Sequence, residues 1–298
     1  MSKNAVAITS SDWHIRSSVP SSRAEKDWFE VMRKRMDQFR QLRERIGHVP
    51  ILIAGDLFDR WNPNANLVTW CMEHLPDKLY SISGQHDTSG WRYESRMEGA
   101  YGALVKSHVI TDIPHGDWVS IGGGLDVCGL PWGHYDLPAS KPKGKLSVIL
   151  LHKYVYATSD TAYTGVDTGA CVTGITELAD KANIVAIGDN HCKWRVSSFL
   201  NHGSLFSTTS AQKDHAHHLG ILYSDGSYDW MRFPEESVEW VESPVNPEDP
   251  GADKFIQELK TLEVDAVCFR EQLDSLAENL SENGKNSYKS LVESLDQR

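Results

Sequence analysis

The sequence predicts an α/β fold, and three observations support this prediction. Short apolar runs of four or five residues recur along the chain and are separated by longer amphipathic segments. Such runs are typical of parallel strands that are buried on both faces. Each run leads into polar residues, three of them through a glycine, and the ends of strands are where open α/β sheets place their ligands. The runs are Ala5–Ile8, Ile51–Ala54, Leu79–Ile82, Ser147–Leu151 and Ile184–Ile187.

The segments between these runs predict helices and further strands. In residues 23–45, apolar side chains such as Met32, Met36 and Phe39 recur at helical spacing with charges between them, which favours an amphipathic helix. Shorter helices are expected at 67–75, 95–106 and 174–182. Short strands are expected within 109–130 and at 194–199, 203–207, 218–224 and 228–233, the last two joined by an Asp-Gly turn.

The C-terminal part of the chain differs from the rest. We expect one domain over residues 1–243, a proline-rich linker over 244–250 and a helical hairpin over 251–298. Apolar residues step by three and four along the first part of this hairpin: Leu259, Leu262, Ala266, Phe269, Leu273, Leu276 and Leu280. Because such a seam is not stable in water, it must pack on the following shorter helix, on a second copy of the chain in a homodimer, or on a partner protein.

Composition bounds the classes of function. The 298 residues carry 30 Lys and Arg against 41 Asp and Glu, a formal net charge of −11, which is the wrong sign for coating nucleic acid by bulk charge. A local basic stripe and bound dications can still attract a phosphate. With no long apolar run and no signal peptide, we expect a cytoplasmic protein without a membrane partner. Five scattered cysteines without a C-x-x-C motif predict free thiols.

The ends of the apolar runs carry residues that suit a metal centre. Five short motifs follow the runs: Ser11-Asp12-Trp13-His14, Gly55-Asp56 with Asp59-Arg60, Gly84-Gln85-His86-Asp87, His152, and Gly188-Asp189-Asn190-His191. Hard oxygen donors together with imidazoles suit two divalent ions such as Mn²⁺ or Mg²⁺. The polar segment 154–174 directly follows His152, so it is expected to be a loop that faces the substrate, with a flexible connection as the alternative.

The order of these motifs resembles the calcineurin-like metallophosphoesterase superfamily from Asp12 to His191. The sequences GDLFDR and GQHD, and a GDNH followed by Asn-His-Gly-Ser at 201–204, are most similar to the SbcD branch of DNA repair nucleases, which includes compact versions from bacteriophages. The resemblance implies a two-sheet α/β/β/α sandwich with a dimetal cleft at the strand ends. A phage-encoded chain would act in the host cytoplasm.

The resemblance also implies a role for each motif residue. Asp56 would bridge two ions, Mn²⁺ being the expected metal and Mg²⁺ the alternative. The first ion would be completed by Asp12, His14 and His191, and the second by Gln85, His152 and Asp189. His86 would carry no metal and would stabilise or protonate the leaving oxygen. The supporting residues would be Asp87, which orients His86, Asp59, which orients a ligand, and Arg60, which holds Asp59 or the phosphate.

Two departures from the family pattern concern the second ion. Gln85 stands in place of the usual Asn, and Asp189 stands in place of the first His of G-H-x-H. Both residues keep an oxygen donor, so we expect a retuned second site, with a weak or empty site as the alternative.

The function expected from the resemblance is a Mn²⁺-dependent DNA exonuclease, with endonuclease activity as an addition, in a complex with an SbcC-type ABC ATPase. One alternative is a metallophosphoesterase that acts on small phosphoesters or nucleotides. Another is a mainly structural subunit that tethers DNA ends and has a weakened second metal. Trp13, Trp61, Trp91 and Trp194 could stack on unpaired bases, although core packing is expected for at least two of them.

Overall fold

The computed structural model describes residues 3–138, 142–162, 171–234 and 238–241. These residues belong to the first of the two units into which the chain divides, residues 1–241. The expected linker at 244–250 and the expected helical hairpin at 251–298 lie outside the described residues. Within the described ranges, no helix is long and apolar enough to cross a membrane.

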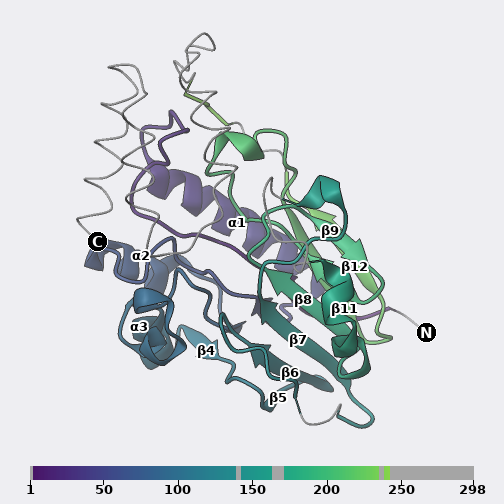
Figure 1. Ribbon diagram of the computed structural model, residues 1–298. Coiled ribbons are helices and arrows are strands. Elements are labelled where there is room, and N and C mark those ends of the chain that lie inside the picture. The colour runs from purple at the N-terminus through teal and green to yellow at the C-terminus, as the bar shows by residue number, and fades with distance from the viewer. Residues whose placement is uncertain (1–2, 139–141, 163–170, 235–237, 242–298) are drawn as a thin grey trace, which may run out of the picture. The chain divides into compact units, whose positions relative to one another are not determined.

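The first sheet has a parallel centre with an antiparallel edge (Figure 1). Its order is β12 (Tyr228–Arg232), β11 (His218–Tyr223), β1 (Ala5–Ser10), β2 (Ile51–Ile53), β3 (Leu79–Ser81) and β4 (Ile110–Asp112). Strands β1 to β4 run parallel, and β11 and β12 join as an antiparallel hairpin beside β1. The carboxyl ends of β1, β2 and β3 therefore meet at one edge of the sheet.

The second sheet repeats this plan. Its order is β5 (Trp118–Gly122), β6 (Leu125–Leu130), β7 (Leu146–His152), β8 (Ile184–Gly188), β10 (Phe199–Asn201) and β9 (Trp194–Val196). The four central strands β6, β7, β8 and β10 are parallel, and β5 and β9 are antiparallel edges. The expected single strand at 194–199 is instead the pair β9 and β10, because the chain turns at Ser197, whose φ is +54°.

The two sheets pack face to face, as the side-chain alternation of the strands requires. In β2, Ile51 and Ile53 face a cluster shared with the helices, whereas Leu52 faces the cluster between the sheets. In β7, Val148 and Leu150 lie between the sheets, and the alternate residues pack on the outer face. Both faces of these strands are buried, which explains why their sequences are apolar runs without alternation.

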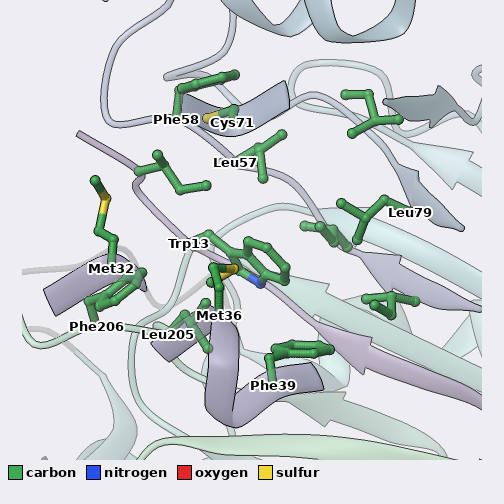
Figure 2. Packing of buried hydrophobic residues seen from close by; sticks show 14 of the residues in the cluster. Trp13, Met32, Met36, Phe39, Leu57, Phe58, Cys71, Leu79, Leu205 and Phe206 are labelled. Carbon is green, nitrogen blue, oxygen red and sulfur yellow. The ribbon is translucent and has the colours of Figure 1, made fainter. Parts of the chain in front are cut away.

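Three helices cover the outer face of the first sheet: α1 (Trp28–Ile46), α2 (Ala65–His74) and α3 (Ala100–Lys106). Figure 2 shows Met36 and Phe39 of α1 beside Trp13, whose ring centroid is 5.4 Å from that of Phe39. Trp13 is fully buried between two motif residues, so this core directly supports the loop that follows β1. The predicted two-sheet sandwich is therefore confirmed.

The outer layer of the second sheet differs in detail from the expectation. The helix predicted at 174–182 is a 3₁₀ segment, η5 (Val172–Asp180), whose regularity is broken at Ile175 with φ −127° and ψ 18°. Its Val172, Ile175 and Leu178 still cover the sheet. In the described part of the chain, the short segment η5 covers this face, whereas three α-helices cover the outer face of the first sheet.

Three further boundary predictions were wrong, each for a local reason. Helix α1 begins at Trp28 because Asp27 caps it, accepting a hydrogen bond from Glu30 N. The helix expected at 95–106 is split by the extended Gly99 into the 3₁₀ segment η2 (Tyr93–Met97) and α3. Residues 203–207 form no strand because the chain turns beneath the β1 loop, where Leu205 N donates to Asp12 O (3.1 Å).

Candidate metal centre

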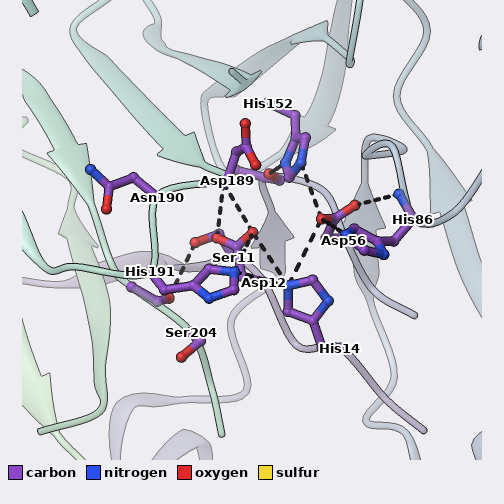
Figure 3. Close-up of polar contacts among 12 residues, drawn as sticks. Ser11, Asp12, His14, Asp56, His86, His152, Asp189, Asn190, His191 and Ser204 are labelled. Atoms are coloured by element: carbon purple, nitrogen blue, oxygen red, sulfur yellow. Dashed lines mark hydrogen bonds and ion pairs between the residues drawn. The ribbon is translucent and has the colours of Figure 1, made fainter. Parts of the chain in front are cut away.

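The motif residues converge because the carboxyl ends of strands from both sheets meet. The loop after β1 hydrogen-bonds to the loop after β2, with His14 N donating to Asp56 O (3.1 Å). Across the sheets, Asp189 N donates to both carboxylate oxygens of Asp12, at 2.9 and 3.1 Å. Figure 3 shows four histidines, His14, His86, His152 and His191, around the two buried carboxylates.

Four motif residues have left-handed backbone conformations: Asp12 (φ +51°), His14 (φ +44°), Asp56 (φ +50°) and Asp189 (φ +86°). For residues other than glycine this conformation costs about 1–3 kcal/mol each, and it is concentrated at functional sites. The backbone reversal at each position turns the side chain inward from the strand end. Local backbone strain at these four residues therefore accompanies the convergence of their side chains on the centre.

Two glycines make the close approach of the loops possible. A Cβ atom at Gly84 would lie 2.0 Å from Asp56 Oδ1, and one at Gly55 would lie 2.2 Å from His152 Nδ1. Gly55 also has a φ of +90°, which side chains rarely adopt. The glycines of the two motifs are therefore required by packing at the centre itself.

On one side of the centre, Asp12, His14 and His191 form a group. The two histidines approach at 3.0 Å between their Nε2 atoms, and Asp12 Oδ1 lies 4.0 Å from His14 Nε2 and 3.9 Å from His191 Nε2. Burial lowers the pKa of His191 to about 4 and that of His14 well below its usual value. Both rings are thus neutral at pH 7, as a metal-binding imidazole must be.

On the other side, His152 faces oxygen atoms. Its Nδ1 donates to the carbonyl of Ala54 (2.7 Å), so Nε2 points at Gln85 Oε1 (2.6 Å) and Asp56 Oδ2 (3.4 Å). Burial alone would lower the pKa of His152, but the carboxylates, led by Asp56, raise it to about 10. Asp189 accepts from Gln85 Nε2 (2.8 Å), so the two departures from the family pattern contact each other.

The residues fit divalent cations on their donor chemistry and spacing. Within the described residues, three groups have potential ligand atoms within 4.8 Å of one another: Asp12, His14 and His191; His14, Asp56 and His86; and Asp12, Asp56 and His152. Burial and the neighbouring Asp56 and Asp189 raise the pKa of Asp12 to about 8, against the opposing effect of His152. Although burial would raise the pKa of Asp56, the histidines around it, led by His152, instead lower that pKa. The raised pKa of Asp12 indicates that its ionised form lacks a compensating positive charge, which a bound cation would supply.

His86 is oriented differently from the other histidines. Its Nδ1 donates to the backbone carbonyl of Asp59 (2.9 Å), and its Nε2 lies 3.9 Å from Asp56 Oδ2. The side chain is 42% exposed, whereas His14 and His152 are buried. One nitrogen is thus held by the protein, and the other is available to a substrate at the open edge of the centre.

The supporting residues contact the centre through the backbone. Asp87 accepts hydrogen bonds from Leu57 N (3.2 Å), Phe58 N (2.9 Å) and Gly84 N (3.0 Å), so it ties together the loops after β2 and β3. An effect of Asp87 on His86 would therefore act through the loop, and the orienting role stays a prediction. Asp59 contacts His86 only through its carbonyl, and its carboxylate lies near Arg60 Nε (3.7 Å).

Sequence reasoning missed Gln212. Its Nε2 donates to Ser204 Oγ (2.7 Å) and lies 3.2 Å from His191 Nδ1, and its Oε1 accepts from Thr208 N (2.7 Å). The side chain is buried and holds the His191 ring in place. Gln212 lies in a short 3₁₀ segment, η6 (Ser210–Gln212), and no motif in the sequence signals it.

Outside the candidate ligands, several buried rings have packing roles. His217 is buried and lies between Ser204 O (2.7 Å) and Ser207 Oγ (3.0 Å). Trp13 and Trp194 are buried in the core, as expected for at least two of the tryptophans, whereas Trp91 is 66% exposed.

Several solved structures are similar to this chain at low sequence identity. A putative 5′-nucleotidase from Staphylococcus aureus is 12% identical with a TM-score of 0.47, covering 80% of this chain and 54% of its own. A 5′-nucleotidase precursor from Thermus thermophilus is also 12% identical, with a TM-score of 0.44 and coverages of 80% and 55%. A calcineurin-like phosphoesterase from Bacillus subtilis is 8% identical, with a TM-score of 0.38 and coverages of 80% and 91%.

No curated protein matches the sequence. A family model described as calcineurin-like phosphoesterase matches residues 8–193, which is more than half of the 298 residues. This span begins in β1 and includes every motif around the candidate metal centre. The chain therefore belongs to the calcineurin-like phosphoesterase family.

Proposed function

We propose that this phosphoesterase is a Mn²⁺-dependent DNA nuclease that hydrolyses phosphodiester bonds. The observation that carries the proposal is the position of His86, an exposed imidazole beside the buried carboxylate Asp56. A phosphodiester releases an alkoxide, which is a poor leaving group unless it receives a proton. An imidazole fixed through one nitrogen and open at the other is suited to supply that proton.

Each part of the centre then has a task. When bound, two divalent ions would neutralise charge on the phosphoryl oxygens and activate water. Asp56 Oδ2 lies 3.8 Å from His14 Nε2 and 3.4 Å from His152 Nε2, so Asp56 would help to hold both ions. His86, whose Nδ1–H donates to the Asp59 carbonyl, would in its imidazolium form give its Nε2 proton to the leaving oxygen and become neutral.

The choice of DNA over small phosphoesters rests on the resemblance of GDLFDR and GQHD to the SbcD branch. The exposed Trp91 supports it, because a base can stack on such a ring in single-stranded DNA. Mn²⁺ is favoured because the Asp189 carboxylate replaces an imidazole and makes the donor set harder.

The test compares substrates with one purified protein. We expect Mn²⁺-dependent kcat/KM to be higher for single- or double-stranded DNA than for p-nitrophenyl esters and 5′-nucleotides. Protein prepared in parallel with Asp56→Asn controls for contaminating nucleases, because it should lose every activity. Hydrolysis of nucleotides without hydrolysis of DNA would instead support a small-molecule phosphoesterase. Full occupancy by two ions, measured by metal analysis, would argue against a structural subunit with a weakened second metal.

We further propose that residues 251–298 bind an SbcC-type ABC ATPase in a repair or recombination complex. The support is the apolar seam in the sequence of this segment, which requires a packing partner. Deletion of residues 251–298 should abolish co-purification with such an ATPase while the nuclease still cleaves short DNA. Equal ATPase binding by the full and truncated chains would contradict the proposal, and a monomer-dimer change on deletion would assign the seam to a homodimer.

A further inference from the structure

A small cavity is lined in part by Asp59, the residue whose carbonyl accepts from His86 at the edge of the metal centre. Its volume is about 180 Å³, and it is lined by residues 15–18 and by residues 59, 60 and 62–64. The first lining segment directly follows His14, and the second includes Asp59, whose carbonyl holds His86. The cavity is therefore next to the part of the centre where the leaving group must lie.

The cavity walls are rigidly joined. Ile15 N donates to Leu57 O (2.9 Å), and Asp59 N donates to Ile15 O (3.1 Å), so the two lining segments pair like short strands. On the far wall, Asn64 caps α2 by accepting from Leu67 N (3.0 Å), which places the positive end of that helix dipole at the rim.

Two guanidinium groups and one carboxylate set the charge of this cavity. Arg16 is anchored by Nε to Ser18 O (3.0 Å) and by Nη1 to Asp59 Oδ1 (3.3 Å). Arg60 lies with Nε 3.7 Å from Asp59 Oδ2 and is 68% exposed. Two positive groups share one negative group, so the cavity has a net positive charge in a chain whose formal net charge is −11.

The volume of the cavity and the hydrogen-bond donors in its lining indicate which ligand it would bind. At about 180 Å³ it is smaller than the usual pockets for drug-sized ligands, about 300–1,000 Å³, and it cannot enclose a whole nucleotide. Arg16 and Arg60 both line the cavity, and Ser17 and Asn62 add polar residues to the lining. The Arg16 guanidinium also donates to Ser18 and Asp59, whereas the Arg60 side chain is 68% exposed. Guanidinium forks match the tetrahedral oxygens of phosphate.

We propose that this Arg16–Arg60 cavity is a subsite for the phosphate adjacent to the one that is cleaved. It rests on the proposed nuclease function and adds a substrate rule: a phosphodiester that carries a neighbouring phosphate is preferred to one that does not. A polynucleotide offers such a phosphate at almost every bond, whereas a nucleoside monophosphate or a simple diester offers none.

The experiment uses three dinucleotides that differ in one group: TpT, pTpT and TpTp. We expect wild-type protein with Mn²⁺ to cleave one of the phosphorylated forms with a higher kcat/KM than TpT. Arg60→Gln and Arg16→Gln should each lower the ratio of these two kcat/KM values about tenfold, the worth of one charge-assisted phosphate contact of about 1.4 kcal/mol. Arg33→Gln is the matched control, because Arg33 lies on α1 and pairs with Glu30 and Asp37.

The ratio of the two kcat/KM values distinguishes phosphate binding by the arginines from positioning of Asp59 and His86. If the arginines only hold Asp59, and through it His86, their replacement will lower both kcat/KM values and leave the ratio unchanged, which would overturn the subsite. A wild-type enzyme that cleaves DNA but treats all three dinucleotides alike would also overturn it and leave the nuclease proposal intact. Cleavage of p-nitrophenyl esters without cleavage of any dinucleotide or DNA would overturn both proposals.

Discussion

The surroundings of two histidines in the second sheet, His152 at the end of β7 and His202 just after β10, differ in a way that identifies the metal centre. Both side chains are buried. His202 contacts the hydroxyls of Thr9 (2.6 Å) and Tyr228 (2.9 Å), and burial lowers its pKa to about 3. His152 is equally buried, yet the nearby carboxylates raise its pKa to about 10. Burial alone lowers the pKa of a histidine, so the raised pKa of His152 reflects the carboxylates gathered around it, led by Asp56, and such a group of carboxylates favours a cation.

Among the substitutions that test the metal centre, Asp56→Asn is expected to have the largest effect. Asparagine has nearly the same shape and tolerates the left-handed backbone of position 56, so the fold should persist. We expect loss of bound metal and a loss in kcat of about 10³-fold or more, since metal chemistry supplies several kcal/mol of transition-state stabilisation. Metal analysis and turnover on DNA measure this, and retention of both ions would contradict a bridging role.

The next largest effect is expected for His86→Ala. Both metals should remain, while turnover on DNA should fall about 10²–10⁴-fold, as is typical when a positioned general acid is removed. The loss should be much smaller for a p-nitrophenyl ester, because nitrophenolate leaves without receiving a proton. Equal losses on the two substrates would indicate that His86 binds the phosphate or a metal instead of protonating the leaving group.

A double-mutant cycle sharpens the description of the His152 side. Gln85→Asn and Asp189→His should each weaken binding of the second Mn²⁺, because the Gln85 amide bridges His152 and Asp189. The double mutant restores the usual family pair and should recover part of the loss, with a coupling free energy of about 0.5–3 kcal/mol. Calorimetric Mn²⁺ titration of the four proteins measures it, and strictly additive losses would show that the two residues do not share an ion.

The smallest effect is expected at His202 and concerns stability. Its pKa is about 3 in the folded protein and about 6.5 in the unfolded chain, so only the unfolded chain takes up the proton between these values. Below pH 6.5 this uptake lowers the free energy of unfolding by about 1.4 kcal/mol per pH unit. His202→Gln removes that contribution, so the stability gap between wild type and variant should shrink from pH 7.5 to pH 4.5 in urea titrations with a chelator present. A gap that is equal at both pH values would show that His202 is already charged in the fold.

The sequence pattern was sufficient to predict the buried strands and the candidate site residues that follow them directly in the chain. The apolar runs predicted the buried strands, and the polar residues after them are the ones that the structure brings together. Gln212 could not be found in this way, because its contact with His191 depends on how the loop after β10 folds back across the centre. The 3₁₀ geometry of η5 was also missed, since its apolar spacing fits either kind of helix; Gly174, which directly precedes the break at Ile175, is the one local signal that could have indicated it.

The left-handed backbone at Asp12, His14, Asp56 and Asp189 has a consequence for how this protein can change. At about 1–3 kcal/mol for each residue, the combined strain is comparable with the whole stability of a typical domain, about 5–15 kcal/mol. Glycine at any of these positions would relieve strain and remove a side chain from the centre. Such a replacement would therefore gain stability while losing a candidate ligand, which is the usual trade-off between stability and activity at a functional site.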